Sequence, residues 1–320
     1  VDDAAPWEMP PTALPAESPT LPLAGVPAAD ESGHRSAPVL DPAALAALES
    51  HIHATTCRAA ELATRGAYFA ARAEMLKSLR AVTQTLDANQ GTREHTDALG
   101  RAMRAFREVS ELAPQGAGRG LDLDLAQVAS GHRTPVLQDQ DLDRMTPVAA
   151  QQRYLEYARD QFALACGNLP PASQALSALA HIYALLDRTP LQTETLCVAK
   201  AVALQQAALT VDPHNSRAAN ELGVLLASCG QLEEARRVLL HSVSVQPAAA
   251  AWHNLSVVHQ RMGQTELAYR ASQQSEAAAA AQHGDARSNV PVRSVHWVDP
   301  QTFSAVRALP APYQDHQEKE

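Results

Sequence analysis

The stretch ANELGVLLASCGQLEEARRVLLHSVSVQP, residues 219–247, contains two helix-forming segments that are separated by Gly230 and closed by Pro247. Apolar residues recur within it at three- and four-residue spacing, as they do along one face of an α-helix. Gly223 in the first segment and Ala235 in the second are small, so the two backbones can approach closely there. The stretch therefore predicts a pair of closely packed antiparallel helices.

The same spacing recurs along the chain, which indicates a repeat. Four sets combine an Ala, a large side chain or Gln four residues later, and a Pro twelve residues after the Ala: Ala102, Phe106, Pro114; Ala158, Phe162, Pro170; Ala201, Gln205, Pro213; and Ala235, Leu239, Pro247. Three segments combine a Leu, a small residue and a further residue three positions later: Leu179, Ala180, Tyr183; Leu222, Gly223, Leu226; and Leu255, Ser256, His259.

This pattern resembles the tetratricopeptide repeat, a helix pair with a period of about 34 residues. The resemblance is closest over residues 172–282, where Ala201 and Ala235 are 34 residues apart and Ala268 begins a further copy 33 residues later. Upstream the steps lengthen to 56 and 43 residues, so the repeats there are degenerate. The resemblance implies an all-α fold, a right-handed superhelical solenoid of antiparallel helix pairs. The first helices would line a concave groove for a protein segment.

Five regions are expected from the composition along the chain. Residues 1–41 hold eight prolines and are predicted to be a disordered linker. The others are N-terminal helices with a degenerate repeat (42–114), an irregular insertion loop (115–147), the repeat domain (148–282) and a C-terminal tail (283–320). The tail holds Trp297 and Phe303 and is expected to cap the last repeat, with a linear motif for another protein as the alternative.

Composition narrows the classes of partner and cofactor. The chain has 320 residues, 46% hydrophobic but 4% aromatic, which favours helices. A net charge of -9 without a Lys/Arg run argues against nucleic acid. The sequence has no apolar run long enough to span a membrane. The four cysteines form no CxxC pair and the histidine pairs lack metal-ligand spacing, so we expect no metal and no cofactor.

Candidate binding residues follow from the expected groove. Residues two positions before and after the central Leu of each first helix, and others about a turn away, should face it: Gln174, Ser177, His181, Arg217, Asn220, Val224, His253, Val257, Gln260 and Arg261. The Lys and Asn with which family members clamp a C-terminal carboxylate are absent from these positions. Arg217 and Arg261 are expected to be solvated or to pair with Glu221 or Glu266. Alternatively, a tail or loop of the same chain fills the groove.

The insertion loop supplies a second set of candidates. A structureless insertion of this length within a helical stack is uncommon and is typically functional or disordered. His132 and Arg133 either project into the groove or toward a partner, or belong to a connection that packs along the superhelix.

These observations predict a non-enzymatic scaffold or adaptor that binds a protein or peptide. Two alternatives remain open: an accessory region of an enzyme or assembly whose active part precedes Val1, and a self-associating structural protein. The Ala-rich composition and degenerate repeats suggest a bacterial source. An anchor before Val1 would place the chain on the cytoplasmic or periplasmic face of a membrane.

Overall fold

The computed structural model describes residues 40–113, 124–138, 140–188 and 195–285. Throughout these ranges the regular elements are helices, which confirms the predicted all-α class. The contacts divide the chain into two compact units, Val1–Gln246 and Pro247–Glu320. The expected linker, up to residue 39, and the tail from residue 286 lie outside the described residues.

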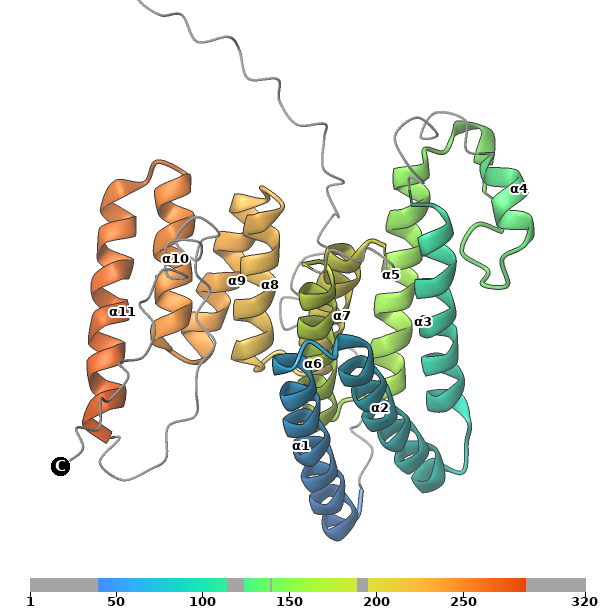
Figure 1. The fold of residues 1–320 in the computed structure, drawn as a ribbon, viewed down its shortest axis with the longest axis horizontal. Coiled ribbons are helices and arrows are strands. Elements are labelled where there is room, and N and C mark those ends of the chain that lie inside the picture. The colour runs from blue at the N-terminus through green and yellow to red at the C-terminus, as the bar shows by residue number, and fades with distance from the viewer. Residues whose placement is uncertain (1–39, 114–123, 139, 189–194, 286–320) are drawn as a thin grey trace, which may run out of the picture. The chain divides into compact units, whose positions relative to one another are not determined.

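Figure 1 shows the helices of the described residues in chain order. The first unit contains α1 (Pro42–Thr64), α2 (Tyr68–Gln90), α3 (Glu94–Glu111), α4 (Leu125–Ser130), the 3-10 turn η1 (Leu142–Arg144), α5 (Pro147–Cys166), α6 (Pro170–Leu186), α7 (Cys197–Val211), α8 (Ser216–Ser228) and α9 (Leu232–Val245). The second contains α10 (Ala249–Arg261) and α11 (Thr265–Asp285).

Three helix pairs follow the predicted repeat. Helix α6 packs on α7, and α8 packs on α9, while α10 packs on α11 in the second unit. Ala201 and Ala235, the small residues of the second helices in the first unit, are completely buried. Gly223 lies so close to Leu239 that a Cβ atom on the glycine would be 2.5 Å from the leucine Cγ. The repeat positions therefore serve close helix packing, as predicted.

The upstream helices pair differently from the units that the sequence indicates. The second-helix pattern occurs in both α3 and α5, and these two helices pack on each other across the insertion. Ala102 and Ala158 are both fully buried, which allows the close approach. The Phe106 ring contacts Phe162 of α5 and Tyr183 of α6, with centroids 5.0 and 5.8 Å apart. Aromatic repeat positions from three helices thus form one cluster.

The N-terminal hairpin covers part of α6. Both α1 and α2 contact α6, and α2 also contacts α3. The Arg72 guanidinium of α2 lies 5.8 Å from the Tyr183 ring centroid. As a result most residues of α6 are buried, and Pro170 and Gln174 are exposed in its first turns.

Lys200 of α7 is buried in the same core, at 1% exposure. Its ammonium donates a hydrogen bond to Ser110 Oγ at 2.7 Å. The Phe106 and Tyr183 ring centroids each lie 5.9 Å away. The hydroxyl and the two ring faces therefore replace part of the water that the charge loses on burial.

Asp87, at the end of α2, fixes the start of α3. Its carboxylate accepts backbone hydrogen bonds from His95 at 3.0 Å and Thr96 at 2.9 Å. Burial raises the pKa of this carboxyl, but the hydrogen bonds from Thr96 and His95 outweigh that effect and lower it. The ionised side chain thus caps a helix from outside it.

Candidate functional site

Five of the six predicted groove residues of the first unit are exposed or half-buried on α6 and α8. Gln174 and Arg217 are exposed, and His181, Asn220 and Val224 are half-buried. On α8 the spacing of Arg217, Asn220 and Val224 places them on one face of the helix. We call this set of five residues the α6–α8 surface.

Ser177 is not part of this surface. The residue is 4% exposed, and its backbone carbonyl accepts a hydrogen bond from Gln205 Nε2 of α7 at 3.4 Å. Gln205 occupies the position in α7 that Leu239 occupies in α9, and it is completely buried. The spacing rule that selected Ser177 does not account for the helices packed around α6.

Glu221 joins the two helices of the α6–α8 surface. One carboxylate oxygen lies 3.2 Å from His181 Nδ1 of α6, and the other lies 3.7 Å from Arg217 Nε one turn earlier on α8. Burial raises the pKa of Glu221, but the hydrogen bond and charge of His181 and the charge of Arg217 outweigh it, so the pKa is lowered. The sequence indicated Glu221 only as a partner of Arg217. Its contact with His181 could not be predicted, because the two residues are far apart along the chain.

The remaining groove candidates lie on α10, in the second unit. His253, Gln260 and Arg261 are exposed, and Val257 is half-buried. Glu266 contacts Arg270 four residues later on α11. These side chains form a polar face of α10 with one apolar residue.

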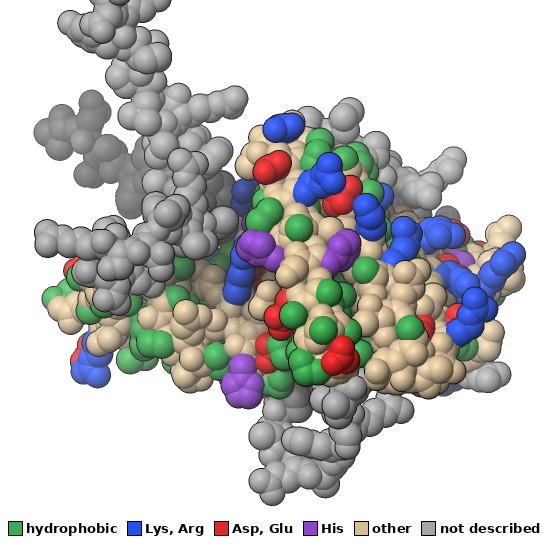
Figure 2. All heavy atoms as spheres, turned by 90° about the horizontal axis from the view of Figure 1, so that it is seen from below, with side chains coloured by type: hydrophobic (Ala, Val, Ile, Leu, Met, Phe, Trp, Pro, Cys, Tyr) green, Lys and Arg blue, Asp and Glu red, His purple; other side chains and the backbone are tan. Residues whose placement is uncertain are grey.

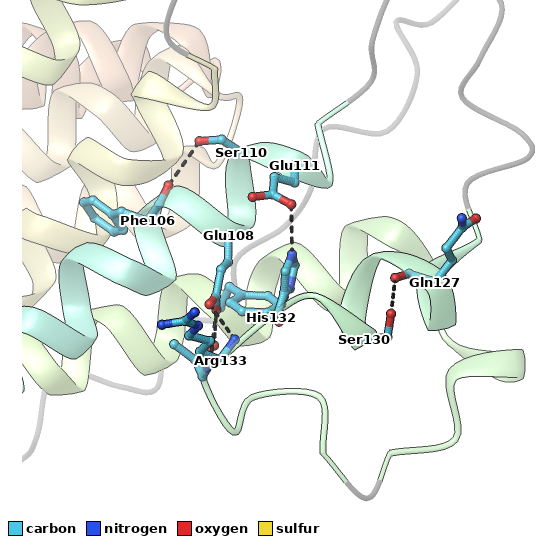
Figure 3. Close-up of polar contacts among 10 residues, drawn as sticks. Phe106, Glu108, Ser110, Glu111, Gln127, Ser130, His132 and Arg133 are labelled. Carbon is cyan, nitrogen blue, oxygen red and sulfur yellow. Dashed lines mark hydrogen bonds and ion pairs between the residues drawn. The ribbon is translucent and has the colours of Figure 1, made fainter.

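The insertion loop is held against α3 by a buried carboxylate (Figure 3). Glu108, at 6% exposure, accepts hydrogen bonds from the backbone N–H groups of Arg133 at 2.8 Å and Thr134 at 3.4 Å. The Thr134 hydroxyl donates to the same carboxylate. Residues 133 and 134 are therefore anchored to the helices by their backbone, while the Arg133 residue remains exposed.

His132 packs between two helices. Its Nδ1 lies 2.5 Å from the hydroxyl of Tyr154 on α5, and its Nε2 lies 3.4 Å from the carboxylate of Glu111 on α3. The histidine side chain is 3% exposed. Burial raises the pKa of Tyr154 to about 12, so this phenol remains protonated at neutral pH. In the described loop, the His132 ring thus fills a packed site between α3 and α5.

Basic side chains gather elsewhere in the first unit. Figure 2 shows Lys and Arg side chains over the side that α2 and α3 form. Lys77, Arg80 and Arg107 are exposed on these helices. Glu94 and Asp97 are exposed near the start of α3, so the charge of this side is mixed. The basic residues do not coincide with the α6–α8 surface.

The described residues contain no group of three His, Cys, Asp or Glu side chains placed to hold a metal ion. Within the same residues, every helix is too short or too polar to cross a membrane.

The comparisons with known proteins identify the repeat. Residues 198–256 match the tetratricopeptide repeat family. This match begins in α7, covers the α8–α9 pair and ends in α10. The chain therefore contains tetratricopeptide repeat sequence in an all-helical fold of sequentially packed pairs. Such repeats generally bind other proteins and are typically non-catalytic. The search of curated proteins found no match.

Proposed function

We propose that this protein is a non-enzymatic adaptor that binds a segment of a partner protein on the α6–α8 surface. The observation that carries the proposal is the partly exposed face of two successive first helices, joined by the contact between His181 and Glu221. First helices line the concave face of such repeats, and binding residues lie there in other solenoids. The polar face of α10 continues the same set of positions in the next repeat.

The chemistry of the surface suits a peptide. Arg217, with 67% of its side chain exposed, keeps guanidinium donors accessible while it contacts Glu221. Gln174 offers both a donor and an acceptor, and Val224 adds an apolar contact. Because Glu221 restrains His181 and Arg217, these side chains lose little conformational freedom when a ligand binds.

The proposal is tested by charge reversal on this surface. In the full chain, Arg217→Glu with Val224→Glu places two carboxylates on the exposed face of α8. Capture of partner proteins from native lysate by this variant is expected to fall at least about tenfold, which corresponds to about 1.4 kcal/mol of binding free energy.

A matched control variant carries equivalent substitutions, one Arg and one aliphatic residue to Glu, on α9. Arg237→Glu with Leu240→Glu changes an exposed Arg and an exposed aliphatic residue, since Leu240 is 42% exposed. This variant should retain the same partner. Equal capture by both variants at unchanged helicity would exclude the α6–α8 surface as the binding site.

A further inference from the structure

A cavity of about 190 Å³ lies between α5, α7 and the end of α8. Leu155 of α5, Val202 of α7 and Leu226 of α8 form much of its wall. Each of these side chains is at most 3% exposed. This part of the wall thus belongs to the apolar core of the first unit, while other lining residues, such as Asp187, are exposed. None of the lining residues belongs to the α6–α8 surface.

Two cysteines complete the wall. Cys197 begins α7, and Cys229 follows α8. Burial raises the pKa of the Cys229 thiol, so the thiol is neutral at physiological pH. A neutral thiol contributes a weakly polar, polarisable surface. Polar side chains at the cavity include Asp187 and Gln231, which can orient a ligand that carries a hydrogen-bond donor.

Leu196 supplies the least expected part of the wall. It precedes α7 with a φ of 56°, in the left-handed region that glycine normally occupies. A bulky L-residue is strained there, and the half-buried Leu196 side chain regains only part of the apolar burial that would offset the strain. Strained residues cluster at binding sites, where the surrounding structure holds them. A glycine would remove the strain, but it would also remove this part of the wall.

We propose that this cavity is a binding site for a compact apolar molecule of about the size of one aromatic ring. An apolar cavity of about 150 Å³ already admits benzene. The lining matches such a ligand because aliphatic side chains and the neutral Cys229 thiol make up most of the wall, with polar side chains such as Asp187 and Gln231 beside them. The site goes beyond the adaptor function, and neither depends on the other.

The first test uses indole and toluene as probes with the full chain. Cys229 lines the cavity and Cys57 is exposed on α1, so the alkylation rates of the two thiols compare a site reporter with an internal control. At a probe concentration of about ten times Kd, only about one-tenth of the sites stay empty, so alkylation of Cys229 should slow roughly tenfold. Alkylation of Cys57 should not change. Equal effects on both thiols, or none up to probe solubility, would overturn the proposal.

Substitutions in the cavity wall, with one control outside it, test whether the protection of Cys229 arises in this cavity. Ala199→Phe places a ring in the cavity and should abolish protection of Cys229, whereas Ala73→Phe on the exposed side of α2 should leave it intact. Leu196→Gly should weaken probe binding several-fold without lowering Tm, because the glycine removes wall and strain together. If Leu196→Gly binds the probes as the native chain does, or if Ala199→Phe folds and keeps the protection, the assignment of the cavity is wrong.

Discussion

Gly223 and Leu239 pack so closely that a Cβ atom on the glycine would lie 2.5 Å from Cγ and 2.8 Å from Cδ2 of the leucine. Both residues belong to the repeat pattern, Gly223 in the first helix and Leu239 in the second. The absence of a side chain at one position thus makes room for the side chain at the other. This contact explains in physical terms why the pattern joins a small residue with a large one.

Gly223→Ala is expected to destabilise the fold. Overpacking costs about 1–3 kcal/mol, and the gain of about 1 kcal/mol in helix propensity offsets only part of it. We expect a net loss of up to about 2 kcal/mol in the free energy of unfolding, measured by urea denaturation. The double variant Gly223→Ala with Leu239→Ala should lose less stability than the sum of the losses in the two single variants, because it no longer contains the clash.

Gly100 provides the matched control for this substitution. It also lies within a helix, but a Cβ atom there would meet nothing within 4 Å. Gly100→Ala should therefore raise the free energy of unfolding by about 0.5–1 kcal/mol. If the free energy of unfolding rose in both Gly→Ala variants, the contact between Gly223 and Leu239 would not be tight.

Glu108→Ala is expected to release the insertion loop from α3. The substitution leaves the N–H groups of the exposed Arg133 and the buried Thr134 without their acceptor, at a cost of about 1–3 kcal/mol for the buried group. Hydrogen exchange at these two amides should accelerate. Glu111→Ala is the control, because 58% of that side chain is exposed and its loss should change stability by no more than about 0.5 kcal/mol. Unchanged exchange in Glu108→Ala would contradict the anchor.

Glu221 predicts a pH dependence for the contact between α6 and α8. Its folded pKa lies below the ordinary value of 4.5, so the ionised form stabilises the fold. This contribution is fully present above that value and is lost as the pH falls through the lowered folded pKa. At pH 7, Glu221→Gln should lose about 0.5–1 kcal/mol of stability. When the free energy of unfolding is measured at a series of pH values, the difference between this variant and the native chain should shrink below the ordinary pKa. If the stability difference between the native chain and Glu221→Gln grew as the pH fell, the result would contradict a stabilising role of the ionised Glu221.

The cysteines should differ widely in reactivity toward iodoacetamide. Cys57 is exposed, whereas Cys166 is 1% exposed, and burial raises the pKa of the Cys166 thiol to about 12. Since the thiolate is the reactive form, Cys57 should be alkylated in the folded chain, and Cys166 only after unfolding. Mass spectrometry of peptides over time measures both rates. Rapid alkylation of Cys166 in the folded chain would contradict its place in the core.

The sequence predicts most of this fold because the repeat positions are local signals. Gly223, Ala235 and Pro247 each act within one helix pair, so their spacing alone indicates the pair. The pairing of α3 with α5 could not be predicted in this way. Both helices carry the second-helix pattern, and an insertion with residues 114–123 outside the described structure separates them. The packing of the α1–α2 hairpin on α6 likewise depends on contacts far apart in the sequence.

The candidate site was predictable only in part. Spacing along α8 identifies Arg217 and Val224, because a single helix determines which of its residues share a face. The burial of Ser177 and the contact between His181 and Glu221 depend on neighbouring helices. The burial of Lys200 also depends on its neighbours, because a lysine is normally expected to be exposed. The left-handed backbone of Leu196 could not be predicted either, because leucine rarely adopts that conformation.

Site-specific photocrosslinking tests the adaptor account most directly. A photoreactive phenylalanine replaces Val224 on the α6–α8 surface of the full chain, or Leu240 on α9 as the control, and mass spectrometry identifies the crosslinked peptides in native lysate. The account predicts that position 224, but not position 240, crosslinks to one defined segment of another protein. Crosslinks from position 224 only to this chain's own residues, or the same products from both positions, would contradict it.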